Sequence, residues 1–137
     1  MIYVIAGKKG SGKTKRILDM ANETSKHRKG DVVFIDDDNR YMYDLKTDVR
    51  FVDAGEFEIT GTVPLISFIS GMISQNFDIE TIFIDGFLKI VACDIAECGA
   101  FFDRLGKLTQ RYNTKFVLSI SGDPGVMPEF VTRYIQE

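Results

Sequence analysis

The sequence predicts an α/β fold, in which a mostly parallel sheet of about five strands is covered by helices on both faces. Short apolar runs alternate along the chain with segments whose apolar residues recur every three or four positions, as strands alternate with amphipathic helices. The strand-like runs are apolar throughout, which is typical of strands buried on both faces. No repeat and no linker rich in Pro, Gly or Ser divides the 137 residues, so we expect one domain over residues 1–137.

The first half of the chain predicts a strand, a helix and two further strands. Residues 2–6 form an apolar run that ends at Gly7, as a short buried strand would. A helix is expected over residues 13–25, because apolar side chains repeat on one of its faces. A second strand is expected at 32–35, directly before three aspartates, and a short third strand at 50–52.

The second half continues the alternation. Pro64 suits the first turn of a helix that starts near Thr62, and residues 81–84 form another apolar strand. Asp94, with Glu97 three residues later, has the capping-box pattern, which predicts a helix starting there and burying residues up to Tyr112. A last strand at 115–120, a turn at 122–125 and a closing helix at 128–135 complete the prediction.

The charge balance and the apolar runs exclude several classes of protein. There are 17 Lys and Arg against 20 Asp and Glu, a net charge of -3, so no nucleic-acid partner is expected. No apolar run approaches the ~18 residues that a membrane span needs. The N-terminal apolar run is short and has no basic residues before it, unlike a secretory signal, so a cytoplasmic location is expected.

The chain lacks the ligands for a zinc site of four Cys and His residues, because it contains only Cys93, Cys98 and His27. We interpret both cysteines as small buried apolar residues of a protein from a reducing compartment.

Residues 7–14 match the pattern G-x-x-x-x-G-K-[ST] at every fixed position. The glycines allow the backbone N–H groups to approach phosphate, and the helix that follows adds the positive end of its dipole. Lys13 would place its charge on the β- and γ-phosphates as the catalytic residue, and the Thr14 hydroxyl would bind Mg²⁺. The predicted nucleotide-binding residues are Gly7, Lys8, Lys9, Gly10, Ser11, Gly12, Lys13, Thr14 and Lys15.

Asp85 ends the apolar strand at 81–84 and is the second expected magnesium ligand, directly or through water. Both Thr14 and Asp85 must then approach one ion, so we expect their side-chain oxygens within roughly 4–6 Å of each other. The alternative is that Asp85 only stabilises the turn with Gly86.

With these two motifs the sequence resembles the P-loop NTPases, residues 7–14 as Walker A and residues 82–85 as Walker B. It looks most like small uncharacterised P-loop proteins of Gram-positive bacteria that are often labelled "twitching motility protein PilT". The resemblance covers nearly the whole chain. It implies the three-layer α/β/α P-loop NTPase fold and nucleotide binding, but not motility, because pilus-retraction motors are several times longer.

Two weaker resemblances concern parts of the chain. Lys8 lies where the MinD/ParA group carries its signature lysine, and residues 36–38 lie where that group has Asp-x-Asp, but Lys9 replaces a glycine of that group. The loop also resembles that of thymidine kinases, whose acidic residue after the Walker B Asp and four zinc cysteines are absent here.

Many P-loop ATPases carry a Glu directly after the Walker B Asp to activate the attacking water, and this chain has Gly86 there. Asp38, Asp53 and Glu56 are the candidates for a replacement carboxylate. Two kinds of auxiliary residue remain as candidates: a polar residue that senses the γ-phosphate, and an arginine acting across an interface. Candidates for the γ-phosphate sensor are Ser119 and Ser121. Candidates for the arginine acting across an interface are Arg104, Arg111 and Arg133.

The sequence therefore predicts a protein that binds Mg-ATP and hydrolyses it slowly, or only when a partner protein or a second copy of the chain stimulates it. ATP is preferred over GTP because no Asn/Thr-Lys-x-Asp motif is present. One alternative is a small phosphotransferase, for which residues 39–61 are the only stretch that could supply a lid. Another is a binding module that holds nucleotide as a regulatory ligand without hydrolysing it.

Overall fold

The computed structural model describes residues 1–135, which form an α/β fold around one five-stranded sheet. All the strand pairs are parallel, and the strand order is β1-β5-β4-β2-β3. The predicted α/β class, the parallel sheet and the number of strands are confirmed. The strands are β1 (Ile2–Gly7), β2 (Asp31–Asp36), β3 (Val49–Asp53), β4 (Ile79–Ile84) and β5 (Lys115–Ser121).

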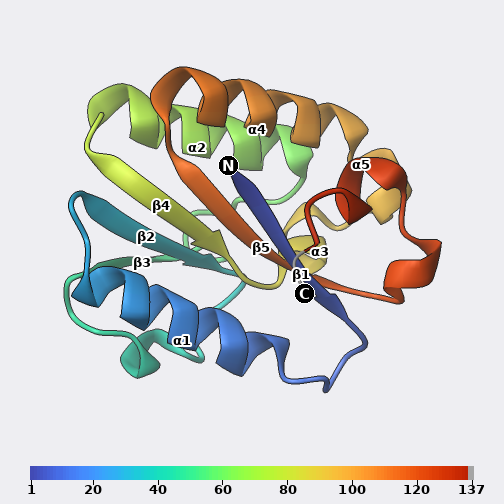
Figure 1. Cartoon of the computed structure of the whole chain (residues 1–137), viewed down its shortest axis with the longest axis horizontal. Coiled ribbons are helices and arrows are strands. Elements are labelled where there is room, and N and C mark those ends of the chain that lie inside the picture. The colour runs from blue at the N-terminus through green and yellow to red at the C-terminus, as the bar shows by residue number, and fades with distance from the viewer. Residues whose placement is uncertain (136–137) are drawn as a thin grey trace.

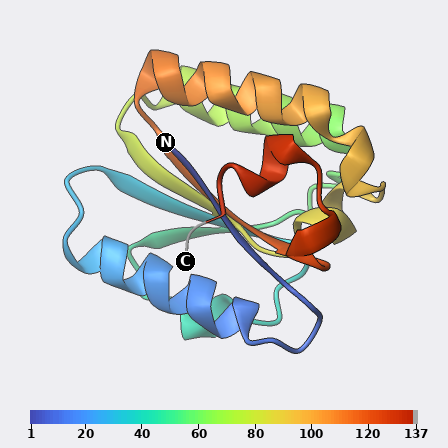
Figure 2. The same cartoon turned by 45° about the vertical axis from the view of Figure 1, so that its right-hand side comes forward.

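Helices cover both faces of the sheet. In Figures 1 and 2, α1 lies alone on one face, while α2 and α4 run side by side across the other. The α-helices are α1 (Lys13–Lys26), α2 (Thr62–Gln75), α3 (Phe87–Val91), α4 (Gly99–Tyr112) and α5 (Glu129–Thr132). Three short 3-10 turns are η1 (Met42–Asp44), η2 (Ile95–Glu97) and η3 (Pro124–Val126).

The strand residues divide between two cores, one on each face of the sheet. Val32 and Phe34 of β2 pack in the core under α1, whereas Val33 and Ile35 belong to the core under α2 and α4. Successive strand residues point to opposite faces, so a strand in the middle of this sheet must be apolar at every position. This is why the strand-like runs in the sequence do not alternate with polar residues.

The structure departs from the predicted helices in the region after β4. The sequence did not indicate α3, a five-residue helix that begins directly after Gly86. Asp94 caps the 3-10 turn η2 by accepting a hydrogen bond from the Ala96 N–H (3.2 Å), and α4 begins only at Gly99. The expected closing helix at 128–135 is reduced to the four residues of α5, after which Ile135 bridges to Val4 of β1.

Both cysteines belong to the core under α4. Cys98 is fully buried and Cys93 is half-buried, with their Sγ atoms 3.7 Å apart. Burial raises the pKa of the Cys98 thiol to about 12, so this thiol stays protonated at neutral pH.

Over residues 1–135, no helix has both the length and the apolar character that a membrane crossing requires.

The strand order creates a switch point between β2 and β4. After β2 the chain moves outward to the edge strand β3, whereas after β4 it moves the other way, through α3 and α4, to β5. The connections therefore leave these two neighbouring strands in opposite directions and open a crevice at their carboxyl ends. Ligands of open parallel sheets bind at such points.

Candidate functional site

A cleft of about 530 Å³ lies at this switch point, at the carboxyl ends of the strands. One wall is the glycine-rich loop between β1 and α1 (residues 7–14, called the glycine loop below) with the first turn of α1. The others are the end of β2 with residues 37–41, the turn from β4 into α3, and the end of β5. Segments far apart in the sequence thus contribute to one site.

The glycine loop has a backbone that other residues adopt only with strain. Gly10 and Gly12 have φ of 84° and 88°, in the left-handed region that favours glycine. A side chain on Gly7 would place its Cβ 2.6 Å from Ser11 Oγ. The Ser11 N–H donates to Lys8 O (3.1 Å), which closes the loop. The backbone thus favours glycine at positions 10 and 12, whereas the obstacle at position 7 is the rotatable Ser11 hydroxyl.

The first turn of α1 carries only positive charge. Gly12 caps the helix without a side-chain hydrogen bond, no acidic residue occurs in the first turn, and Lys13, Lys15 and Arg16 follow. Cations are unfavourable at this positive end of the helix dipole, whereas an anion is favourable. The Lys13 ammonium is half-buried and donates to Lys8 O (3.1 Å), so it lies back over the loop. This helix start is therefore suited to an anion.

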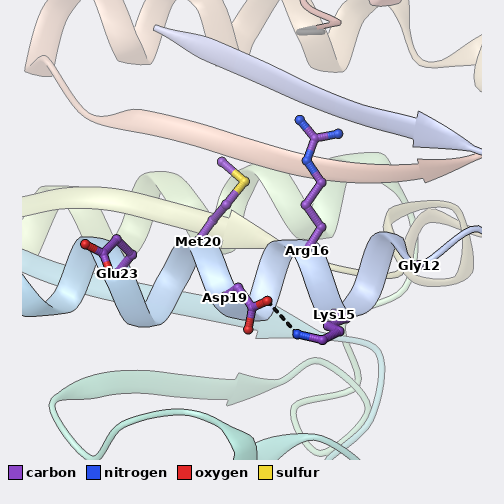
Figure 3. Close-up of a pocket in the computed structure, with 6 residues that line it drawn as sticks. All are labelled: Gly12, Lys15, Arg16, Asp19, Met20 and Glu23. Atoms are coloured by element: carbon purple, nitrogen blue, oxygen red, sulfur yellow. Dashed lines mark hydrogen bonds and ion pairs between the residues drawn. The ribbon is translucent and has the colours of Figure 1, made fainter.

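A second hollow, of the same volume, runs along the outer surface of α1 from Gly12 to Glu23 (Figure 3). It is more open than the cleft, and a single helix supplies all of its lining. Its charged side chains already include one pair, Lys15 Nζ to Asp19 Oδ2 at 2.8 Å. Few convergent polar groups remain there, so the cleft at the strand ends is the better candidate site.

Thr14 and Asp85 meet in the cleft, as the sequence predicts. The Thr14 hydroxyl donates to Asp85 Oδ2 at 3.2 Å, closer than the expected distance. The two strands that carry the site, β1 and β4, are parallel, with β5 between them. From β5, the Ser119 hydroxyl donates to the other carboxylate oxygen, Asp85 Oδ1, and accepts a bond from the Gly86 N–H (3.2 Å). Asp85 is therefore held at both oxygens.

Asp37 lies directly over Gly86. Gly86 has φ of 68°, and a Cβ built on it would lie 2.6 Å from Asp37 Oδ1 and 3.2 Å from Asp37 Cγ. The carboxylate at the end of β2 thus occupies the space in which residue 86 would otherwise carry its own side chain. The buried Phe87, whose ring is centred 5.0 Å from that of Phe101, anchors the turn beneath them.

Asp36 is the most deeply buried acid of the cleft, only 2% exposed. Its Oδ1 accepts a bond from the Asp37 N–H (2.8 Å), but Oδ2 finds no hydrogen-bond partner among residues 1–135. Burial first, and then the contact with the Asp37 side chain and the negative charge of Asp85, raise the pKa of Asp36 to about 9, against the opposing effect of the Asp37 N–H bond. Asp36 is therefore a neutral carboxylic acid at pH 7.

The cleft wall contains six of the nine predicted nucleotide-binding residues and both predicted magnesium ligands, while Gly7, Lys8 and Ser11 lie in the same loop without lining the cleft. Ser119 and Ser121 also line the cleft, and the remaining candidates are divided. Asp38 lines the cleft and forms an ion pair with Arg40 (3.2 Å). Asp53 instead accepts bonds from its own turn, from the Gly55 N–H (2.9 Å) and the Glu56 N–H (3.3 Å). Among the residues described, Asp53 and Glu56 are not part of the cleft wall, nor are Arg104, Arg111 and Arg133.

Sequence reasoning missed two parts of the cleft. One is Asp36 with Asp37, and the other is Arg40 with Tyr41, from the segment after β2. The sequence shows three consecutive aspartates after a strand, where the MinD/ParA group has Asp-x-Asp, but only the pairing of β2 with β4 brings Asp36 near Asp85 and Asp37 over Gly86. The available signal was an acidic strand end in a parallel sheet, where ligands generally bind.

No protein-family model and no curated protein sequence matches the chain, so its function is argued from this geometry.

Proposed function

We propose that the chain is a P-loop NTPase that binds Mg-ATP in the cleft and hydrolyses it slowly or with the help of a partner. The phosphates would lie on the glycine loop, with their charge against Lys13 and the N-terminus of α1. A second copy of the chain or another protein would complete the site. The cytoplasm is the compartment in which we expect this activity.

The observation that carries the proposal is the start of α1. Three cations and no acid lie in its first turn, behind a loop with two left-handed glycines, and no side chain caps the helix. Without an anion this arrangement opposes the helix dipole, and with a phosphate it satisfies it. A purely structural turn gains nothing from Lys13 and Lys15 at these positions.

The residues opposite the loop fit a magnesium ion. The Thr14 hydroxyl and the Asp85 carboxylate are oxygen donors, which Mg²⁺ prefers, and their oxygens are close enough to share one ion. Ser119 fixes the orientation of Asp85 from the side opposite Thr14. When bound, the ion would neutralise charge on the terminal phosphates.

The phosphotransferase alternative has weaker support. The segment that could supply its lid, residues 39–61, contains β3 at its centre, and β3 pairs with β2 over the register Val32–Val49 to Asp36–Asp53. A strand fixed in the sheet cannot close over a substrate. Only the short stretches on either side of β3 remain for that role.

Calorimetry with MgATP, MgGTP and ATP in EDTA, followed by phosphate-release assays with and without candidate acceptors, tests the proposal. We expect MgATP to bind, to bind more weakly in EDTA, and to release phosphate slowly without an acceptor. Turnover only with an acceptor would indicate the phosphotransferase, and tight binding without turnover would indicate the binding module. Absence of MgATP binding would refute nucleotide binding altogether.

A further inference from the structure

The space beside Gly86 is filled by the carboxylate of another strand. Asp37 Oδ1 comes within 2.6 Å of the position that a Cβ of residue 86 would take, so the two segments touch at the end of the adjacent strands β2 and β4. Asp37 is partly exposed, and its side chain lines the cleft together with Lys13, Thr14 and Asp85. A carboxylate therefore stands next to the proposed magnesium ligand although the sequence has glycine there.

We propose that Asp37 supplies the carboxylate that orients the water attacking the terminal phosphate, an inference that rests on the proposed function above. Gly86 is then the feature that admits this carboxylate, because any larger residue at position 86 would overlap Asp37. Gly86, after β4, and Asp37, after β2, therefore act together in positioning this carboxylate.

The neighbouring Asp36 is suited to hold the Asp37 carboxylate in place. Its Oδ2 is buried and has no hydrogen-bond partner among residues 1–135, although it lies in the wall of the cleft. An unpaired buried polar atom costs about 1–3 kcal/mol, so native structures usually satisfy it with protein, water or ligand. In its neutral form Asp36 would satisfy this atom by donating a hydrogen bond to the Asp37 carboxylate, whose side chain is close enough to raise the pKa of Asp36.

The other acids near the cleft are less suitable for this role. Asp38 is engaged with Arg40, both through its ion pair and through the Arg40 N–H, which donates to Asp38 Oδ1 (2.9 Å). Asp85 is held by Thr14 and Ser119. Within the described part of the chain, Asp37 is thus the cleft carboxylate that lies beside Asp85 without being used to hold Asp85 itself or Arg40.

In the proposed step, the oxygen of the water forms a bond to the γ-phosphorus of ATP. The proton that this water loses passes to the Asp37 carboxylate. The bond between the γ-phosphorus and the bridging oxygen breaks, and ADP leaves with the electron pair of that bond. Lys13 and the backbone N–H groups of the glycine loop face the charge that develops on the phosphates.

The test compares Asp37→Asn with the wild type in three measurements. These are MgATP affinity by calorimetry, single-turnover phosphate release, and affinity for MgADP with and without fluoroaluminate, which mimics the phosphoryl group in transit. Asp103→Asn on the exposed surface of α4 is the matched control, and Asp38→Asn is the competing candidate. Asp37→Ser gives a second test if the asparagine variant is poorly folded by circular dichroism.

We expect Asp37→Asn to bind MgATP as the wild type does, to release phosphate about 10²–10⁴-fold more slowly, and to lose the gain in affinity that fluoroaluminate gives. Wild-type rates in the Asp37 variants overturn the proposal, as does loss of MgATP binding, which would make Asp37 a binding residue. It is also overturned if fluoroaluminate gives the wild type no gain. Failure of the wild type to bind MgATP refutes the proposed function itself, and the proposal with it.

Discussion

Asp36 and Asp85 end neighbouring strands but have opposite hydrogen-bonding environments. Asp85 accepts bonds at both carboxylate oxygens, from Thr14 and Ser119. Asp36 has one buried oxygen without a partner among residues 1–135, and burial keeps its carboxyl neutral with a pKa of about 9. Keeping Asp36 neutral limits the negative charge at a site that we expect to receive a polyphosphate.

The raised pKa of Asp36 predicts an unusual dependence of stability on pH. In the unfolded chain this carboxyl has its ordinary pKa of 3.8, whereas in the folded protein its pKa is about 9. Between these values the folded state binds the proton and the unfolded state does not, so the contribution to stability falls as pH rises. Below pH 3.8 the contribution is fully present, and above about 9 it is lost.

Asp36→Asn removes this titration, so its stability relative to the wild type should rise with pH between about 5 and 9. The slope for one group is at most about 1.4 kcal/mol per pH unit. Urea unfolding of both proteins at several pH values, in EDTA, measures it. Asp103→Asn on α4 is the control for a lost surface carboxylate. A difference between Asp36→Asn and the wild type that does not change with pH would contradict the assignment.

Lys13→Ala should weaken MgATP binding about 10- to 150-fold, because a hydrogen bond to a charged group contributes about 1.5–3 kcal/mol. Folding should be retained, since the hydrogen bond of the ammonium within residues 1–135 is to Lys8 O of its own loop. Calorimetry measures the affinity, and circular dichroism the helix content. Lys107→Ala on the exposed surface of α4 should leave both unchanged. If Lys13→Ala keeps full affinity, the loop does not bind phosphate; if helix content falls, Lys13 is structural.

At the scale of elements, the turn from β4 into α3 depends on Gly86. A left-handed conformation costs an L-residue roughly 1–2 kcal/mol, and a Cβ at this position also overlaps Asp37 Oδ1. Gly86→Ala should therefore lower the free energy of unfolding by at least about 1–2 kcal/mol and displace Asp37, slowing phosphate release.

The matched control is Gly71→Ala in α2, where an added Cβ meets nothing within 4 Å. An alanine inside a helix should raise the free energy of unfolding by about 0.5–1 kcal/mol relative to glycine. Urea unfolding of the two variants measures both changes. Equal stability of the two variants would show that neither the positive φ nor the Asp37 contact constrains position 86.

Elements with a continuous apolar pattern were predictable from the sequence, and short ones were not. The strand at residues 81–84 and the helix starting near Thr62 agree with β4 and α2, because each buries a face along its whole length. The five residues of α3 are too few to show a helical period, and Phe87 is held there by tertiary packing against Phe101. Likewise, the Asp94 capping pattern specifies a cap but not whether an α-helix or a 3-10 turn follows.

The candidate site was likewise predictable only in part, where its geometry depends on residues that are consecutive in the sequence. The glycine loop was predictable because its geometry is encoded within eight consecutive residues. The meeting of Thr14 with Asp85 was inferred only because both were expected to bind one ion. The place of Asp37 over Gly86 was not predictable, since it depends on β2 lying next to β4. The sequence alone therefore leaves Asp38, Asp53 and Glu56 as the candidates.

At the scale of the whole molecule, the parallel sheet gathers the ends of β1, β2, β4 and β5 at one edge, and it determines which charges reach the cleft. Arg40 is the arginine that lines the cleft in the described chain. Its guanidinium forms an ion pair with Asp38 and lies 5.8 Å from the centre of the Tyr41 ring. Arg133 is paired with Glu129 of its own helix, away from the cleft. Arg16, in the first turn of α1, lines the hollow on the outer surface of that helix instead of the cleft. The cleft wall of the described chain therefore contains no arginine that is free of an ion pair.

Because the described cleft wall has no arginine free of an ion pair, we expect the isolated protein to hydrolyse ATP at a rate well below the 1–100 s⁻¹ typical of kinases. A carboxylate that orients water supplies only part of the acceleration, about 10²–10⁴-fold, whereas an arginine donated in trans to a GTPase contributes 10³–10⁵-fold. The measurement is phosphate release at saturating MgATP from monodisperse protein over a series of protein concentrations.

A specific activity that rises with concentration would show that a second copy donates the missing charge, and slow turnover at every concentration would indicate a different partner. Fast turnover that is independent of concentration would contradict the prediction, because one chain would then contain the complete site. Arg40 would be the first residue to replace, since it would have to leave Asp38 to reach the phosphate.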